Sequence, residues 1–140
     1  MTPQKPLVLF VCTGNRARSQ MAEGLLRHLA GERFEVHSAG ILPSGLSQLS
    51  IDAMREIGID ISSQWSKSVD EFAGQSFHYV ITVCDSANGV CPTFPGGGKR
   101  LHWNVEDPSD IEARGVLLDA AFRIARDDLR ARIGRFLVEV

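Results

Sequence analysis

Two kinds of apolar pattern divide the chain into predicted strands and helices. Continuous or alternating apolar residues at 7–11, 34–38, 78–83 and 99–103 predict four β-strands. Residues 19–30 and 48–57 instead repeat apolar side chains every three or four positions, which predicts helices that end near Gly31 and Gly58. The same spacing continues through residues 112–137 and predicts one long C-terminal helix.

The alternation of strands and helices predicts an α/β fold. We expect a single doubly wound domain over residues 1–140, with a four-stranded parallel sheet of order 2-1-3-4 and helices on both faces. Ligands bind such sheets at the carboxyl ends of the strands. Cys12 and Cys84 directly follow two predicted strands, so we expect both thiols at that edge. Residues 85–98 contain four glycines and two prolines, which predicts a loop after Cys84.

Composition limits the function classes without selecting one. The 140 residues are 44% hydrophobic and 23% charged, as in ordinary globular domains. Fifteen basic and seventeen acidic residues give a net charge of −2, which indicates neither a nucleic-acid nor an anionic membrane partner. No apolar run has the length of a membrane span, and the polar first residues do not resemble a signal peptide. We therefore expect a cytoplasmic protein, in which three cysteines are more typical of reactive thiols than of a disulfide scaffold.

The loop between the first strand and the first helix has the residues of an oxyanion cradle. A thiolate at Cys12 would be stabilised by the backbone N–H groups at the helix start. Gly14 lets the loop curl, Asn15 suits a left-handed turn, and the Arg18 guanidinium can bind two oxygens of one anion. Ser19 can donate to the Cys12 sulfur or cap the helix. The predicted cradle is Cys12, Thr13, Gly14, Asn15, Arg16, Ala17, Arg18 and Ser19; the alternative is an ordinary turn with a buried cysteine.

A carboxylate follows the fourth predicted strand, in Asp107-Pro108. Displacement at an oxyanion requires a proton for the departing oxygen, and Asp107 could supply it as a general acid. Pro108 would stiffen the loop. The alternative is that Asp107 only begins a turn or caps the next helix.

Taken together, these segments resemble the low-molecular-weight protein tyrosine phosphatase family over nearly the whole chain. The resemblance rests on residues 11–24, on Ser38-Ala39-Gly40 and on Asp107-Pro108. It implies that Cys12 is the nucleophile, that residues 13–19 and above all Arg18 bind the substrate, and that Asp107 is the general acid.

Two further cysteines narrow the resemblance to thioredoxin-coupled arsenate reductases. Cys84 and Cys91 lie seven residues apart, and His102-Trp103 is also similar to that branch. The resemblance implies a thiol relay for arsenic detoxification: Cys12 attacks arsenate, Cys84 attacks the Cys12 sulfur and releases arsenite, and Cys91 then attacks Cys84. The Cys84–Cys91 disulfide would be reduced by thioredoxin, with no metal and no other cofactor. We also expect binding of phosphate-like oxyanions, a weak phosphatase side activity and a monomer.

Three other functions remain as alternatives. A zinc site would use the cysteines with His102, but no CxxC or His pair at ligand spacing is present. A phosphotyrosine or small-molecule phosphatase is the strongest enzyme alternative, although the acidic loop has Ser109-Asp110 where that branch has aromatic residues. A non-catalytic oxyanion-binding or phosphocarrier module would need no general acid, so Arg18 together with Asp107 argues against it.

Family members often hold a potassium ion beside the cradle. The residues that match its ligands are Asn15, Glu23 and Ser38, but the fourth position, an aspartate in the family, aligns with Lys67. We predict that the Lys67 ammonium takes the place of potassium and pairs with Glu23. The alternative is an exposed loop lysine, as most lysines are.

Overall fold

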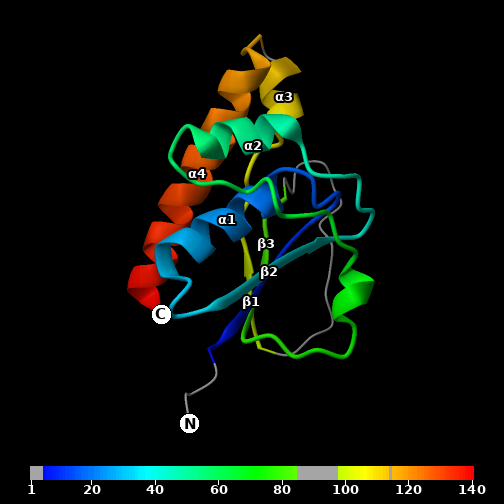
Figure 1. Ribbon diagram of the computed structural model, residues 1–140, viewed down its shortest axis with the longest axis vertical. Helices are drawn as coiled ribbons and strands as arrows, with labels where there is room; N and C mark the ends of the chain where they lie inside the picture. The colour runs from blue at the N-terminus through cyan, green and yellow to red at the C-terminus, as the bar shows by residue number, and fades with distance from the viewer. Residues whose placement is uncertain (1–4, 85–97, 114) are drawn as a thin grey trace.

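A parallel four-stranded sheet forms the centre of the computed structural model, which describes residues 5–84, 98–113 and 115–140 (Figure 1). Its strands are β1 (Leu7–Cys12), β2 (Glu35–Gly40), β3 (Tyr79–Thr82) and β4 (Lys99–His102). They lie in the order β2-β1-β3-β4, and every neighbouring pair is parallel. The predicted α/β class and the sheet order 2-1-3-4 are confirmed.

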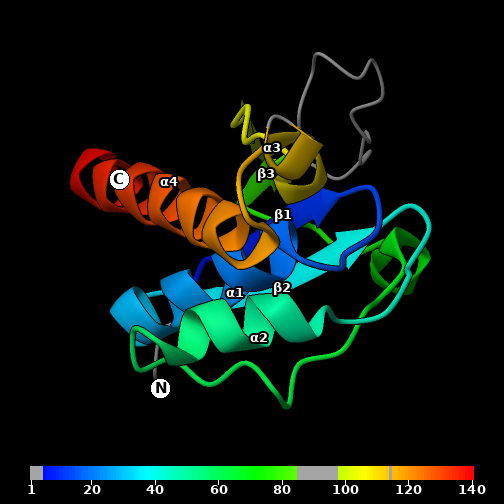
Figure 2. The ribbon, with the colours of Figure 1, turned by 90° about the horizontal axis from the view of Figure 1, so that it is seen from above.

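Helices cover the two faces of this sheet unequally. On one face lie α1 (Arg18–Ala30) and α4 (Leu118–Glu139), with α2 (Gln48–Arg55) packed against both (Figure 2). The opposite face is covered by the short 3-10 helix η1 (Val69–Phe72), whose Phe72 packs on β1. Sequence analysis did not predict η1, although a capping box of Ser68 and Glu71 starts it. Among the described residues, no helix has both the length and the apolarity needed to cross a membrane.

The predicted single helix over residues 112–137 is wrong. The structure has two helices there, α3 (Pro108–Ala113) and α4, which begins at Leu118. Gly115 between them has a φ of 92°, a left-handed conformation that ends a helix. The apolar spacing of α4 was read correctly, but the break in front of it depends on backbone geometry that the spacing does not report.

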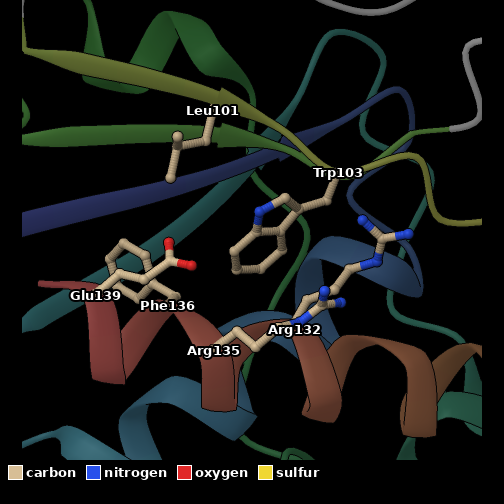
Figure 3. A pocket seen from close by; sticks show the side chains of 6 residues that line it. All are labelled: Leu101, Trp103, Arg132, Arg135, Phe136 and Glu139. Carbon is tan, nitrogen blue, oxygen red and sulfur yellow. The ribbon is translucent and has the colours of Figure 1, made fainter.

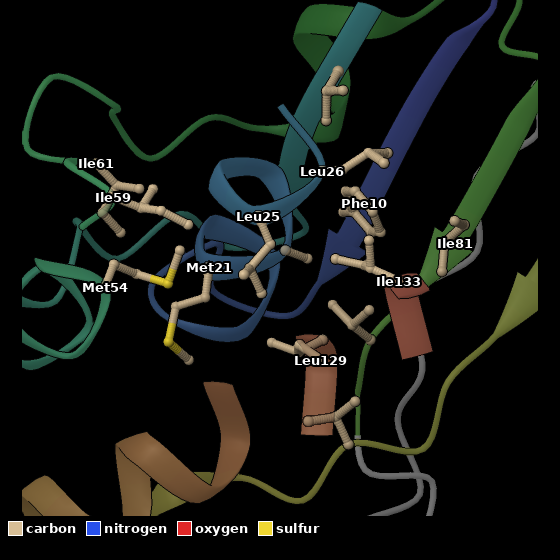
Figure 4. Close-up of a cluster of buried hydrophobic side chains, with 14 of the residues drawn as sticks. Phe10, Met21, Leu25, Leu26, Met54, Ile59, Ile61, Ile81, Leu129 and Ile133 are labelled. Atoms are coloured by element: carbon tan, nitrogen blue, oxygen red, sulfur yellow. The ribbon is translucent and has the colours of Figure 1, made fainter. Parts of the chain in front are cut away.

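The side chains of β1 point alternately into two apolar clusters, and this packing fixes the position of the strand in the sheet. Phe10 and Val8 face the α-helical side, whereas Leu9 and Val11 face η1, and all four are 0% exposed. On the helical side Phe10 and Ile81 pack against α1 and α4 (Figure 4). Full burial of one such side chain contributes about 1.5–3 kcal/mol. This packing holds the carboxyl end of β1 rigidly, and the cradle begins at that end.

Candidate active site

The predicted cradle is the turn from β1 into α1 at the carboxyl edge of the sheet. β1 ends at Cys12, which is 3% exposed, and α1 begins at Arg18. Asn15 has a φ of 47°, the only left-handed non-glycine backbone in the described ranges, as its residue type predicted. Gly40 of β2 lies directly beneath: a Cβ there would come within 2.7 Å of both the Asn15 nitrogen and the Thr13 oxygen. A glycine at position 40 is therefore required for the loop to curl this tightly.

The carbonyl oxygens of residues 13–17 all accept hydrogen bonds from neighbouring segments. Loop residues beyond β2 donate their backbone N–H groups to Thr13, Gly14 and Arg16 at 2.9–3.0 Å. The Asn15 oxygen accepts from the Gln20 side chain at 3.0 Å, and the Ala17 oxygen accepts from the α1 backbone at 2.8 Å. With its carbonyls turned outward, the loop presents its N–H groups inward, which is the geometry of an anion-binding nest.

Two donors are directed at the Cys12 sulfur. The Asn15 N–H donates to Sγ at 3.2 Å, and the Ser19 Oγ lies 2.8 Å from Sγ. The Ser19 oxygen already accepts from the Asn15 side-chain nitrogen at 2.8 Å. Within the described part of the chain, Sγ is then the acceptor left for the Ser19 hydroxyl proton. Hydrogen bonds to a thiolate sulfur stabilise its negative charge, and the thiolate is the nucleophilic form of cysteine.

The structure brings the predicted oxyanion ligand and the predicted general acid together across 89 residues of sequence. Arg18 donates to the Val105 carbonyl at 2.8 Å, and its second nitrogen lies 3.3 Å from the Asp107 carboxylate. Asp107 also accepts from the Ser109 N–H at 2.9 Å, so it caps α3 as well. The catalytic and capping interpretations of Asp107 are therefore compatible, because each uses a different carboxylate oxygen.

A bond from α4 braces the start of the Asp107 loop. Arg132 donates to the Asn104 carbonyl at 3.2 Å while it pairs with Asp128 at 2.8 Å. Arg132 also lines an open groove of about 220 Å³ between β4 and α4 (Figure 3). The groove contains no predicted site residue; its walls are Leu101, Trp103, Arg132, Arg135, Phe136 and Glu139.

Behind the cradle lies a buried cluster of charges. The Lys67 ammonium, in a residue that is only 5% exposed, lies 3.6 Å from the Glu23 carboxylate. It also donates to the Trp65 carbonyl at 2.8 Å and lies 4.7 Å from the centre of the Trp65 ring. Glu23 accepts from the Ser38 hydroxyl at 2.5 Å and pairs with Arg27 at 2.8 Å. Lys67 is thus not an exposed loop lysine.

Two glutamines that sequence analysis did not select lie against the same cradle. Gln20 is 0% exposed and donates to Asn15, and Gln64 in turn donates to Gln20 at 2.8 Å. No sequence signal distinguishes them from ordinary polar residues, because the contact joins α1 to a loop more than forty residues away. Among the described residues, no cluster of three His, Cys, Asp or Glu side chains could hold a metal ion.

Cys84 lies close to the end of the strand beside β1. Val11 pairs with Thr82 in the sheet, and the Val83 N–H donates to the Val11 carbonyl at 2.9 Å, so Cys84 is one residue beyond the position level with Cys12. Cys84 is 2% exposed and disulfide-bonded, whereas Cys12 is a free thiol. Cys91, the third predicted thiol, lies outside the described residues.

Known proteins are similar to this chain in sequence and in fold. The family model for low molecular weight phosphotyrosine protein phosphatase matches residues 7–140. An arsenate reductase of Halalkalibacterium halodurans is 42% identical over 132 residues, which cover 94% of this chain and 95% of that protein. The structure of an arsenate reductase in the phosphate-binding state superposes with a TM-score of 0.79 at 29% identity, covering 96% of this chain and 98% of the other. A thioredoxin-dependent arsenate reductase of Corynebacterium glutamicum matches all of this chain and 66% of its own, with 29% identity and a TM-score of 0.71.

Proposed function

The chain belongs to the low-molecular-weight phosphotyrosine protein phosphatase family, and we propose that within this family it is an arsenate reductase. Arsenate is a tetrahedral oxyanion like phosphate, so the same cradle can hold it. The feature that separates reduction from hydrolysis is a second thiol beside the first. Hydrolysis of a phosphoenzyme needs only water, whereas reduction of arsenic(V) needs two electrons from sulfur.

The first step is attack of the Cys12 thiolate on arsenic. The inward N–H groups of residues 13–19 and the Arg18 guanidinium bind the arsenate oxygens and hold arsenic near Sγ. A sulfur–arsenic bond forms as one arsenic–oxygen bond breaks. Asp107 pairs with Arg18 at 3.3 Å before substrate binds; once arsenate takes the guanidinium, Asp107 binds a proton and gives it to the departing hydroxyl of arsenate, which leaves as water.

The next two steps transfer electrons between sulfurs. Cys84 attacks the Cys12 sulfur, the electron pair of the sulfur–arsenic bond passes to arsenic, and arsenite leaves from a Cys12–Cys84 disulfide. Cys91 then attacks the Cys84 sulfur and releases Cys12 as a thiolate. A dithiol protein of the thioredoxin type reduces the resulting Cys84–Cys91 disulfide, so one dithiol is oxidised for each arsenate reduced.

The observation that carries the proposal is the place of Cys84 relative to Cys12. The two cysteines lie at or just beyond the ends of neighbouring parallel strands, at the carboxyl edge of the sheet where ligands bind, and Cys84 lies one residue beyond the position level with Cys12. A cytoplasmic location and a monomeric state belong to the same proposal.

A coupled assay tests the relay. Purified protein is mixed with arsenate, thioredoxin, thioredoxin reductase and NADPH, and NADPH oxidation is followed at 340 nm. We expect arsenate-dependent oxidation in the wild type and its loss in the Cys12→Ser, Cys84→Ser and Cys91→Ser variants. Cys84→Ser should stop at the arsenic adduct of Cys12, whereas Cys91→Ser should release one arsenite per active site and stop at the Cys12–Cys84 disulfide.

The same preparations distinguish reduction from hydrolysis. If Cys84→Ser and Cys91→Ser turned over arsenate like the wild type, the relay would be wrong. If the wild type left arsenate unchanged but hydrolysed para-nitrophenyl phosphate with Cys12 and Asp107 alone, the protein would be a phosphatase. A low rate with this ester beside full arsenate reduction agrees with the proposal, because the cradle binds both anions.

We further propose that Lys67 supplies the positive charge that the family resemblance assigns to a potassium ion. The fit of the residues to potassium is poor as long as Lys67 is present, because its ammonium already lies 3.6 Å from Glu23. A bound cation would also be repelled by Lys67 at this distance. The reduction should therefore need no potassium.

A further inference from the structure

A chain of side-chain amides leads from a loop at the protein surface to the nucleophile. It starts at Gln64, which is half-buried, and passes through Gln20, Asn15 and Ser19 to the Cys12 sulfur. Each contact is 2.8–3.1 Å long. A hydrogen bond has a direction, so such a chain can determine which end of every amide faces the next residue.

Backbone groups fix the direction at each amide. Gln64 donates to the backbone carbonyl of Gln20 at 3.0 Å as well as to its side-chain oxygen at 2.8 Å, so its nitrogen must face Gln20. The Gln20 nitrogen donates to the carbonyls of Trp65 at 2.8 Å and Asn15 at 3.0 Å, which can only accept. Both glutamines therefore have one possible orientation.

Asn15 is held at both ends by this arrangement. Gln20 donates to its backbone oxygen and, at 3.1 Å, to its side-chain oxygen, and the Lys67 backbone N–H donates to that side-chain oxygen at 2.8 Å. The side-chain nitrogen is left to donate to Ser19 and, at 2.9 Å, to Ser38. The hydrogen bonds from Gln20 thus hold Asn15, the non-glycine residue whose left-handed backbone shapes the cradle.

From these contacts we infer that Gln20 and Gln64 are positioning residues for the nucleophile. They hold Asn15 so that its side-chain nitrogen donates to the Ser19 oxygen. The Ser19 hydroxyl can then donate to the Cys12 sulfur. Ser38 is the other acceptor of Asn15, and its own hydroxyl donates a hydrogen bond to the Glu23 carboxylate. The branch of hydrogen bonds through Ser38 therefore also ends on a charged group. The inference rests on the proposed role of Cys12 as nucleophile, but not on the identity of the substrate.

The test measures the thiolate directly, without arsenate. Reduced protein is treated with iodoacetamide between pH 5 and pH 10, and modification of Cys12 is followed by mass spectrometry of its peptide. In Gln64→Met we expect the rate at pH 7 to fall about three- to tenfold, because the thiolate loses part of its support, and to equal the wild-type rate at pH 10. Gln20→Met should show a larger fall of the same form. Gln48→Met, an exposed glutamine in α2 that donates to Asp52, is the matched control and should not change the profile.

A double-mutant cycle separates positioning from a general structural effect. Ser19→Ala alone should lower the rate at pH 7, and Gln64→Met should lower it less in that background than in the wild type, because only the path through the Asn15 N–H then remains. An equal fall at every pH, the same fall with and without Ser19, or an unchanged rate in both glutamine variants would each overturn the inference. Since arsenate takes no part, these outcomes are independent of whether the protein reduces it.

Discussion

Replacement of Lys67 by methionine tests the proposed internal cation most directly. The change keeps the length and apolar stem of the side chain but removes its charge 3.6 Å from the Glu23 carboxylate. Both side chains are about 5% exposed, so little water can solvate either charge when its partner is removed. At an effective dielectric of about 20, the attraction over this distance is about 4–5 kcal/mol before desolvation is counted.

The net loss is smaller because two terms offset that attraction. Release of the buried ammonium recovers its desolvation energy, and Arg27 remains 2.8 Å from Glu23. The hydrogen bond from Lys67 to the Trp65 carbonyl is lost as well. We therefore expect a destabilisation of about 2 kcal/mol, or a fall of about 4–8 °C in the melting temperature for a domain of this size.

Thermal unfolding in potassium and in sodium chloride at equal ionic strength provides the assay. Wild-type protein should melt at the same temperature in both salts. Potassium should raise the melting temperature of Lys67→Met, because the site between Asn15, Glu23 and Ser38 then lacks the ammonium and can bind the ion. Lys99→Met, at an exposed position in β4, is the control and should change stability by less than about 0.5 kcal/mol. A potassium effect on the wild type as large as on the variant would refute the reasoning, and so would a Lys67→Met variant as stable as Lys99→Met.

The structure predicts the effects of four further substitutions. Gly24→Ala would bring a Cβ within 2.5 Å of the buried Ile61 methyl group and should destabilise by about 1–3 kcal/mol in urea unfolding, whereas Gly134→Ala in the exposed part of α4 has free space and should stabilise by up to about 1 kcal/mol. Asp107→Asn should lower the arsenate-dependent kcat about 10²–10⁴-fold in the coupled assay but leave iodoacetamide labelling of Cys12 within about threefold, since the acid acts on the departing oxygen and not on the thiolate. Hydrogen bonds from Arg123 and then Arg126 hold the pKa of Glu56 below its ordinary value of 4.5, so this carboxylate stabilises the fold above that pH and the contribution is lost as pH falls through the lowered value. Glu56→Gln should accordingly be less stable than wild type in urea at pH 7, with a difference that shrinks below pH 4.5; a constant difference across pH would contradict this.

The sheet and the cradle could be predicted because their signals are local. The apolar run before Cys12, the glycine and asparagine in the loop and the helical spacing after it all describe one short segment. The alternation of elements predicted a parallel sheet, and the parallel register places Cys12 and Cys84 at one edge. Gly115 shows the limit of this approach, since the same apolar spacing is compatible with one helix or with a helix preceded by a break.

The residues that sequence analysis missed are those whose role depends on distant contacts. The role of Gln20 depends on its hydrogen bonds with Trp65 and Gln64. The position of η1 depends on packing of Phe72 against β1. A buried glutamine satisfied by three acceptors looks the same in sequence as a solvated one on a helix surface. Burial and partner direction, which decide its role, are properties of the folded chain alone.

The donors on Cys12 serve two opposite events in the proposed relay. At the start they stabilise the thiolate that attacks arsenic, and at the end the same sulfur must leave when Cys91 attacks Cys84. A thiolate stabilised by its surroundings is a better leaving group, although it is a somewhat weaker nucleophile at full ionisation. A hydrolytic relative uses its cysteine as a leaving group from phosphorus only, so support for a sulfur–sulfur exchange has no value there. Loss of the Ser19 donor should therefore slow the last thiol exchange as well as the first attack. Single-turnover disulfide trapping in Ser19→Ala can resolve the two steps. A Cys12–Cys84 disulfide that accumulates in Ser19→Ala but not in the wild type would show that the donor assists departure of the Cys12 sulfur.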